Sequence, residues 1–189
     1  MGAVTAGIGH NLGPALALGG SWQRHCWSKA RADLLPHLPL EVLRNRVKRA
    51  KELGLDYRTY ASVRATSGHD VVAFLFSSNA LRVLAARPAL PQDRAAKLAV
   101  LACGRIALAQ APLTPDALLS AAPLLDAAHP APAALAGFAE ARAALRAALG
   151  RLPSDTVLLV GDMALERDWC AAGRLAGYLP ADRYFAPQV

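Results

Sequence analysis

The chain has 189 residues, 54% of them hydrophobic and 6% aromatic, and its 21 Lys and Arg outnumber 14 Asp and Glu to give a net charge of +7. This length fits one domain, and this apolar content is enough to form a core, which excludes general disorder. No apolar run approaches the roughly 20 residues that a membrane-spanning helix needs, so we expect no membrane association.

The start of the chain and the cysteines indicate a cytoplasmic protein. The apolar part of residues 1–20 has no basic residue ahead of it and is interrupted by polar residues, unlike a secretory signal peptide. Cys26, Cys103 and Cys170 are odd in number and widely spaced, so we expect reduced thiols in the core. The adjacent His25 and Cys26 would point in different directions on a helix and make a poor metal clamp. We therefore expect no metal site and no cofactor.

The positive charge is confined to the first half of the chain. Residues 1–90 contain 12 Lys and Arg against 5 Asp and Glu, whereas residues 91–189 contain 9 of each. Such an asymmetry is an argument about partners rather than about fold. It favours a nucleic acid or an acidic protein as the partner.

Helices make up most of the expected secondary structure. Residues 1–20 are expected to form a mobile arm, and residues 21–189 a single domain whose first part, residues 21–66, is helical and basic. Apolar spacing, capping residues and prolines predict helices at residues 22–35, 40–53, 56–65, 92–109, 114–125, 133–149 and 164–176. A further helix is expected to begin at residues 77–79, and residues 178–189 are expected to lie over the surface.

Two apolar runs, at residues 71–76 and 156–160, are bounded by turn residues and predict buried strands. Each is followed by a polar turn and a helix, which is typical of a parallel sheet. We therefore predict a helix-dominated α/β domain with a small parallel sheet. Two strands are few for a sheet, so three interpretations stay open. Weaker strands are present, the sheet is a minor part of a helical domain, or the chain forms a homodimer through it.

The segment from Arg46 to Ala65 resembles a helix-turn-helix motif. The motif needs a small residue inside its first helix, a glycine four positions later, and apolar residues that hold the second helix against the first. Ala50 and Gly54 meet the first two demands, and the apolar residues are Leu53, Leu55 and Val63. The segment departs from the pattern at Arg49, where a less charged residue is usual, and at Tyr60, where an aliphatic residue is usual.

The resemblance implies that the second helix enters the major groove of DNA. The residues that would face base edges are Tyr57, Arg58, Ala61 and Ser62. Those that would face phosphates are Arg46, Lys48, Arg49, Lys51 and Arg64. We therefore predict a nucleic-acid-binding or regulatory protein whose partner is DNA or RNA. A plain helical hairpin with a solvated face, or a surface that docks an acidic partner protein, explains the same residues.

Polar residues at the ends of the two predicted strands form an alternative ligand site. Ser77, Ser78 and Asn79 follow the first strand, and Asp162 follows the second. In a parallel sheet these ends lie at the same edge, where α/β proteins bind ligands and where helix starts hold anions. Further candidates for proton transfer or phosphate contact are His69, Glu166, Arg167 and Asp168.

This alternative is a small enzyme that binds a nucleotide or a phosphorylated ligand. The chain has no G-x-x-x-x-G-K-[ST] phosphate-binding loop and no G-x-S-x-G nucleophile motif. Ser, Asn and Asp at strand ends are also ordinary turn formers and helix caps. We therefore assign no catalytic residue from the sequence.

Overall fold

The computed structural model describes residues 38–186. The arm predicted at residues 1–20 and the helix predicted at residues 22–35 lie outside this range. The chain divides into two units, Met1–Leu40 and Glu41–Val189, and the second unit contains the sheet and both candidate sites. In the described part of the chain, no helix combines the length and the apolar character needed to cross a membrane.

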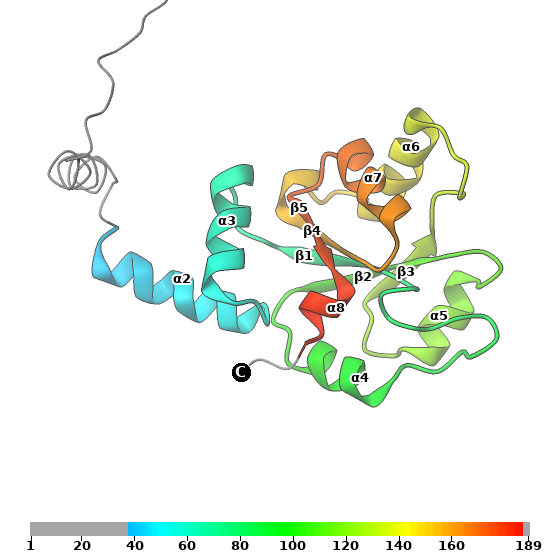
Figure 1. The fold of residues 1–189 in the computed structure, drawn as a ribbon, viewed down its shortest axis with the longest axis horizontal. Helices are drawn as coiled ribbons and strands as arrows, with labels where there is room; N and C mark the ends of the chain where they lie inside the picture. The colour runs from blue at the N-terminus through cyan, green and yellow to red at the C-terminus, as the bar shows by residue number, and fades with distance from the viewer. Residues whose placement is uncertain (1–37, 187–189) are drawn as a thin grey trace, which may run out of the picture. The chain divides into compact units, whose positions relative to one another are not determined.

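Five parallel strands form one sheet, in the order β3-β2-β1-β4-β5 (Figure 1). The strands are β1 (Ala73–Ser77), β2 (Gly104–Ala109), β3 (Ala127–Pro130), β4 (Val157–Gly161) and β5 (Gly177–Pro180). β1 and β4 are the two predicted strands, and they pair with each other at the centre of the sheet. The predicted helix-dominated α/β fold with a parallel sheet is confirmed. Of the three interpretations left open, the first holds, because three further strands of the same chain complete the sheet.

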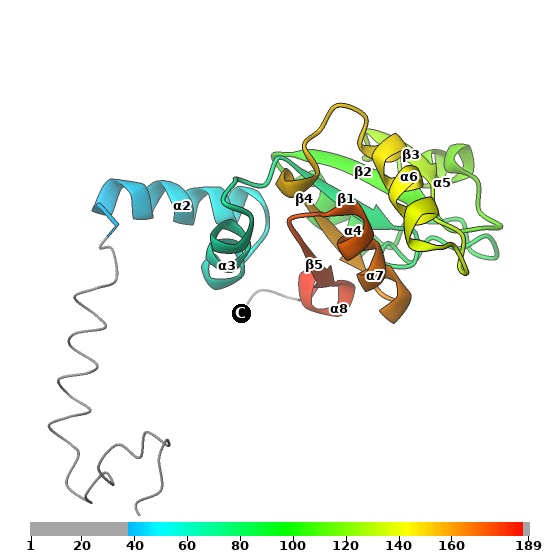
Figure 2. The ribbon, with the colours of Figure 1, turned by 90° about the horizontal axis from the view of Figure 1, so that it is seen from above.

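Helices cover both faces of this sheet (Figures 1 and 2). The helices of the described residues are α2 (Leu40–Glu52), α3 (Tyr57–Ser67), α4 (Gln92–Ala99), α5 (Pro115–Ala121), α6 (Phe138–Leu149), α7 (Ala164–Gly173) and α8 (Ala181–Tyr184). Most of α2 extends away from the sheet (Figures 1 and 2). Phe74 and Phe76 of β1 belong to a core that also contains Tyr60 of α3 and Tyr184 of α8. Leu75 belongs to a second core under α6 and α7. The sheet is therefore buried on both faces, as parallel sheets usually are.

The order of the strands places a topological switch point between β1 and β4. The chain moves outward from β1 through β2 to β3, then returns to pair β4 with the other side of β1. At such a point the loops after the two central strands diverge and leave a crevice at the carboxyl edge of the sheet, where doubly wound proteins bind ligands. The residues after β1 and β4 are therefore the first place to look for a site.

The helix predicted at residues 92–109 is wrong in its second half. α4 ends at Ala99, and Val100, which the predicted helix would continue through, is 67% exposed. Residues 104–109 form β2, which pairs with strands on both sides. Alanine favours helices, so the segment GRIALA resembles the neighbouring helices in composition. Sheet pairing and burial outweigh this local preference, because strand formation depends mainly on packing against neighbours.

The chain after β1 also differs from the prediction, because residues 77–79 begin no helix. Ser77 ends β1, and residues 78–82 form turns. The Ser77 hydroxyl accepts a hydrogen bond from the backbone N–H of Ala80, at 3.0 Å. The backbone N–H of Ser78 continues the sheet pairing by donating to Leu108. Residues 78–82 are therefore held as turns at the end of β1.

The end of the chain is part of the fold up to residue 186. Residues 178–186 were expected to lie over the surface, but they contribute to β5 and α8, and Leu179 and Tyr184 are buried. The helices predicted at residues 114–125, 133–149 and 164–176 are present as the shorter α5, α6 and α7. Short strands such as β5 give little sequence signal, because four residues are too few to show a periodicity.

Cys103 and Cys170 are free and half-buried, which fits the expectation of unpaired thiols. Burial raises the pKa of Cys103 to about 11 and also raises that of Cys170. Cys26 lies outside the described residues.

Candidate functional site

α2 and α3 form the helix pair that the sequence predicts. Four residues, 53–56, connect them, and Gly54 adopts a φ of +61°, which favours glycine. Asp56 caps α3 by accepting a hydrogen bond from the backbone N–H of Thr59 at 2.9 Å. α3 turns steeply away from α2 in both ribbon views, instead of folding back alongside it (Figures 1 and 2). Steep crossing and a short glycine-containing turn are features of the helix-turn-helix.

The inner side of this helix pair is packed against the sheet. Ala50, Leu53 and Leu55 are buried, as the motif requires. Tyr60, the unusual residue of the pattern, is only 2% exposed, and its hydroxyl donates to Asp70 at 2.8 Å. Burial and this hydrogen bond raise the pKa of the Tyr60 hydroxyl. A tyrosine therefore occupies the buried position where the motif usually has an aliphatic residue, and Asp70 accepts the hydrogen bond of its hydroxyl.

Asp70 connects both helices to the start of β1. Arg49 of α2 donates to it through Nε at 3.0 Å, and Arg64 of α3 lies 3.8 Å from its other carboxylate oxygen. Arg49 also donates to Glu52 and to the backbone carbonyls of Val71 and Ala102. Its guanidinium is thus occupied within the fold, so this predicted phosphate contact has an internal role.

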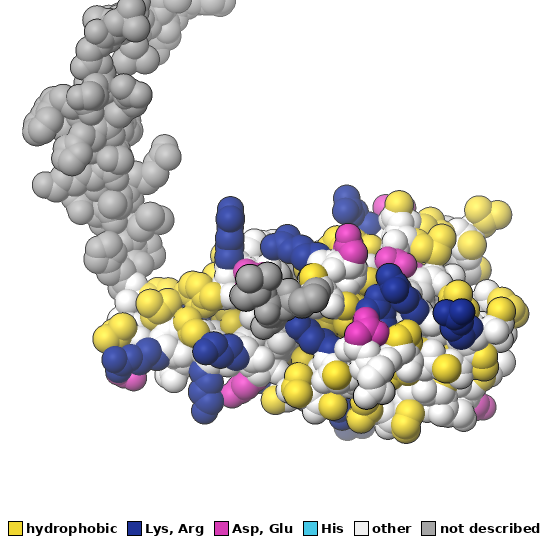
Figure 3. All heavy atoms as spheres, turned by 60° about the horizontal axis from the view of Figure 1, so that its bottom comes forward, with side chains coloured by type: hydrophobic (Ala, Val, Ile, Leu, Met, Phe, Trp, Pro, Cys, Tyr) yellow, Lys and Arg dark blue, Asp and Glu magenta, His cyan; other side chains and the backbone are white. Residues whose placement is uncertain are grey.

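Lys48, Lys51 and Arg58 lie on the outer side of the helix pair, whereas Arg46 lies on the same face as the buried Ala50 and Leu53. Lys48, Lys51 and Arg58 are exposed and Arg46 is half-buried, and within residues 38–186 none of the four forms an ion pair. Figure 3 shows basic side chains along one side of α2 and hydrophobic side chains along the other. Among the predicted base contacts, Arg58 and Ser62 are exposed, whereas Tyr57 and Ala61 are half-buried.

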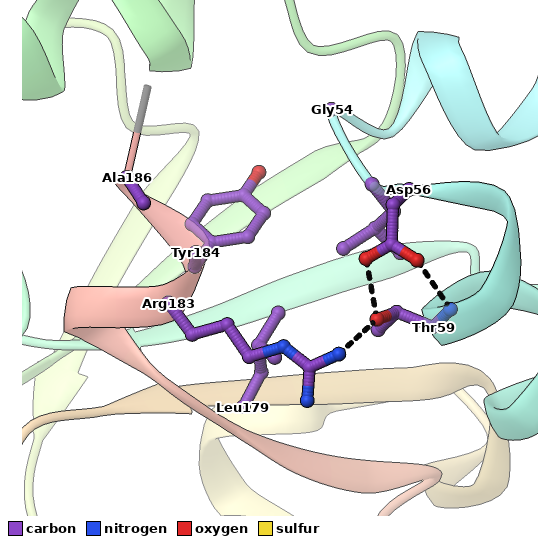
Figure 4. A pocket seen from close by; sticks show the side chains of 8 residues that line it. Gly54, Asp56, Thr59, Leu179, Arg183, Tyr184 and Ala186 are labelled. Carbon is purple, nitrogen blue, oxygen red and sulfur yellow. Dashed lines mark hydrogen bonds between the residues drawn. The ribbon is translucent and has the colours of Figure 1, made fainter. Parts of the chain in front are cut away.

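The start of α3 borders a small pocket of about 180 Å³ (Figure 4). Arg183 of α8 donates to the Thr59 hydroxyl at 2.9 Å, and that hydroxyl donates to Asp56 at 2.6 Å. The hydrogen bond from Thr59 lowers the pKa of Asp56. This chain of hydrogen bonds attaches α3 to the last helix of the fold. Its polar groups are partnered with one another, so it orients α3 rather than offering a site.

The carboxyl edge of the sheet is organised around Glu166, which is fully buried. Its Oε2 accepts from the Ser77 hydroxyl at 2.9 Å, and its Oε1 accepts from the side-chain amides of Asn79 at 2.9 Å and Gln110 at 3.2 Å. The backbone N–H groups of residues 162 and 163 also donate to Oε2, at 2.7 and 3.2 Å. One carboxylate from α7 therefore joins the loops that follow β1, β2 and β4.

The hydrogen bonds around Glu166 leave no acceptor site on its carboxylate for a ligand. Five donors use the acceptor sites of the Glu166 carboxylate, and Ser77 is itself fully buried. A nucleophile and its base must be within reach of a substrate, which these two side chains are not. Within residues 38–186, no group of three or more His, Cys, Asp or Glu side chains is placed to hold a metal ion.

The structure brings together most of the alternative site predicted at the strand ends. Ser77, Ser78, Asn79 and Asp162 all lie at the carboxyl edge. Arg167 lies over the ring of Tyr178, 5.3 Å from its centre. His69 does not join them, because it precedes β1 and pairs with Asp155 at 3.4 Å, ahead of β4. In a parallel sheet the amino ends of all strands lie at one edge and their carboxyl ends at the other. His69, ahead of β1, is therefore at the opposite edge from the residues that follow β1 and β4.

The sequence pattern missed the residues that organise both sites. Gln110 directly follows the helix predicted at residues 92–109, and Asp70 and Arg183 belong to no predicted site. Glu166 was considered only as one of several carboxylates. A usable signal was present at Gly161, because a Cβ there would lie 2.6 Å from Oε2 of Glu166. The absence of a side chain at Gly161 therefore leaves room for the Glu166 carboxylate at the end of β4.

Comparison of the chain with protein-family models, with curated protein sequences and with solved structures gave no significant match.

Proposed function

We propose that this chain binds nucleic acid through the outer side of α2 and α3. The observation that carries the proposal is a difference in ion pairing among the basic residues of α2 and α3. Arg49 and Arg64 are tied to Asp70, whereas the three exposed cations of the outer side, Lys48, Lys51 and Arg58, have no ion-pair partner in the described structure. We call these three residues the basic surface. Cations of this kind add affinity for a phosphate backbone, because each contact releases condensed counterions.

The fixed geometry of the helix pair supports the same proposal. Asp70 receives bonds from both helices, and Arg183 and Asp56 hold the start of α3. A surface that is already ordered loses little conformational entropy when it binds. In this arrangement Lys48 and Lys51 contact phosphates, and Arg58 and Ser62 are the exposed side chains of α3 that reach base edges.

The test is fluorescence anisotropy of labelled duplex DNA, single-stranded DNA and structured RNA with the full chain at several salt concentrations. The variant Lys48→Ala/Lys51→Ala/Arg58→Ala removes three cations of the basic surface. The matched control, Arg142→Ala/Arg146→Ala/Arg151→Ala, lowers the net charge equally but changes the opposite face of the sheet, at and beyond α6.

We expect the logarithm of the wild-type affinity to fall steeply with the logarithm of salt concentration. The first variant should flatten that slope by about 1.8, since Lys48 and Lys51 each lose a phosphate contact that contributes about 0.9. The control should keep the wild-type slope. Equal losses in both variants, or no binding near physiological salt, would refute the proposal. Tight binding of an acidic protein without nucleic-acid binding would favour the competing interpretation of the same surface.

A further inference from the structure

A pocket of about 260 Å³ lies where α6 and α7 end, at the amino edge of the sheet. The two helices lie side by side (Figures 1 and 2), and the chain after each of them leads into the start of a strand, β4 or β5. Arg142 and Arg146 of α6 and Arg174, which follows α7, line the pocket. Within residues 38–186 no acidic side chain lines it, so the pocket carries an excess of positive charge.

These arginines have no partner inside the described fold. Within residues 38–186 the guanidinium groups of Arg142, Arg146 and Arg174 form neither a hydrogen bond nor an ion pair. Arg142 is half-buried, and Arg146 lies one turn later on the same side of α6, a spacing at which like charges repel each other. An anion between them would remove this repulsion.

The ends of the two helices do not use these guanidinium groups. A helix end attracts cations because its last carbonyl groups carry partial negative charge. At both ends backbone N–H groups already bind such carbonyls, since Gly150 donates to Arg146 at 3.1 Å and Leu175 donates to Cys170 at 3.0 Å. The arginine side chains are therefore not needed as caps.

Arg174 is the least expected of the three arginines. It ends α7 with a φ of +53°, in the left-handed region where glycine is the favoured residue. The fold gains no compensating contact, because the side chain is exposed and its guanidinium has no partner among the described residues. Residues held in unfavourable backbone conformations are concentrated at functional sites. This position therefore supports a role for the Arg174 side chain in the pocket.

Three guanidinium groups around one pocket fit a phosphoryl group better than a carboxylate. A phosphate monoester carries nearly two negative charges at neutral pH and has three strong acceptor oxygens, whereas a carboxylate carries one charge on two oxygens. Each guanidinium can donate two parallel hydrogen bonds to such a group, and the Ser154 hydroxyl, which also lines the pocket, is a further donor. The volume suits a small molecule, since a cavity of about 150 Å³ already holds a benzene-sized group.

We propose that Arg142, Arg146 and Arg174 bind the phosphoryl group of a small phosphorylated molecule in the pocket at the ends of α6 and α7. This pocket lies on the face of the sheet opposite to α3, and it is separate from the basic surface. The proposal does not depend on nucleic-acid binding.

The test is isothermal titration calorimetry of the full chain with inorganic phosphate, phenyl phosphate and acetate at constant ionic strength. Arg174→Gly removes one guanidinium and places glycine where the backbone favours it, so we expect this variant to fold. Arg142→Ala removes a second guanidinium. The matched control is Arg151→Ala, because Arg151 is an exposed arginine just after α6 that does not line the pocket. Circular dichroism checks that each variant is folded.

We expect the wild type to bind both phosphate probes more tightly than acetate. Arg174→Gly and Arg142→Ala should each raise the dissociation constant for phenyl phosphate about tenfold or more, the usual effect of losing a hydrogen bond between charged groups. Arg151→Ala should stay within about twofold of the wild type, because salt screens a charge that does not touch the ligand. A wild type that binds neither phosphate probe, tighter binding of acetate, or equal losses in Arg151→Ala and Arg174→Gly would overturn the proposal.

The nucleic-acid assay separates this pocket from the basic surface. The variant that removes the basic surface should lose affinity for nucleic acid and keep wild-type binding of phenyl phosphate. Arg142→Ala/Arg146→Ala/Arg151→Ala should do the reverse, because it removes two of the three arginines that line the pocket. If the arginine variant lost both affinities together, these arginines would belong to a nucleic-acid contact, and the proposal of a separate small-molecule site would be wrong.

Discussion

Replacing Glu166 by alanine removes the acceptor that five hydrogen bonds share. Each hydrogen bond to a charged group contributes about 1.5–3 kcal/mol, but their sum overstates the effect. Burying the carboxylate costs several kcal/mol, which its removal recovers, and water can reach the two backbone N–H groups because these contacts are only partly buried. We therefore expect Glu166→Ala to lower the free energy of unfolding by about 3–5 kcal/mol.

Glu166→Gln should be milder, and the reason lies in the partners of Oε1. The side-chain amides of Asn79 and Gln110 both donate to this oxygen. Each amide can rotate to present its own oxygen to the new NH₂ group, while the oxygen left on residue 166 continues to accept at the Oε2 position. We expect a loss of about 1–2 kcal/mol for this variant.

Urea unfolding measures both variants, with circular dichroism and with the fluorescence of Trp169, which is 3% exposed. In thermal unfolding the alanine variant should melt roughly 10 °C below the wild type, since 1 kcal/mol shifts a domain of this size by about 2–4 °C. The matched control is Glu140→Ala, an exposed glutamate in the first turn of α6. A loss below about 1 kcal/mol for Glu166→Ala, or equal losses for the alanine and glutamine variants, would contradict this account.

Two further predictions concern the same edge of the sheet and the start of α3. Gly161→Ala should lose about 1–3 kcal/mol, because its Cβ would lie 2.6 Å from Oε2 of Glu166 and 2.7 Å from the Tyr178 ring. Gly137→Ala, with nothing within 4 Å, should lose less than about 1 kcal/mol in the same urea assay, since it changes only the N-cap of α6. Asp56→Ala should lose about 1 kcal/mol at neutral pH, because it removes the cap of α3. The pKa of Asp56 is lowered in the fold from its ordinary 3.8, so its contribution is present above that value and is lost as the pH falls through the lowered pKa. The difference between wild type and Asp56→Ala in urea unfolding should therefore shrink in acid, and a difference independent of pH would rule out the charged cap.

Local signals were sufficient for the helix pair at the start of the described chain. Gly54 and Asp56 indicated where α2 ends and α3 begins, because a left-handed turn and a side-chain cap depend on neighbouring residues alone. The structure places both within the expected turn. The roles of the arginines were not local. Arg49 was predicted as a phosphate contact together with Lys48 and Lys51, but its partner Asp70 lies 21 residues away.

The carboxyl edge of the sheet was predictable only in part, for the same reason. The parallel arrangement of β1 and β4 implied that Ser77, Asn79 and Asp162 would meet, and they do. Gln110 could not be expected there while β2 was taken for a helix.

Local sequence patterns were enough to predict the fold class and the segments whose character depends on near neighbours, namely the capped helices and the two apolar strands β1 and β4. Tertiary structure alone decided that the alanine-rich residues 104–109 pair as a strand and that Glu166 binds three loops. A helix preference of less than about 1 kcal/mol per residue is outweighed when a segment gains two strand neighbours and two covered faces. Those neighbours come from distant parts of the chain, so no local pattern encodes them.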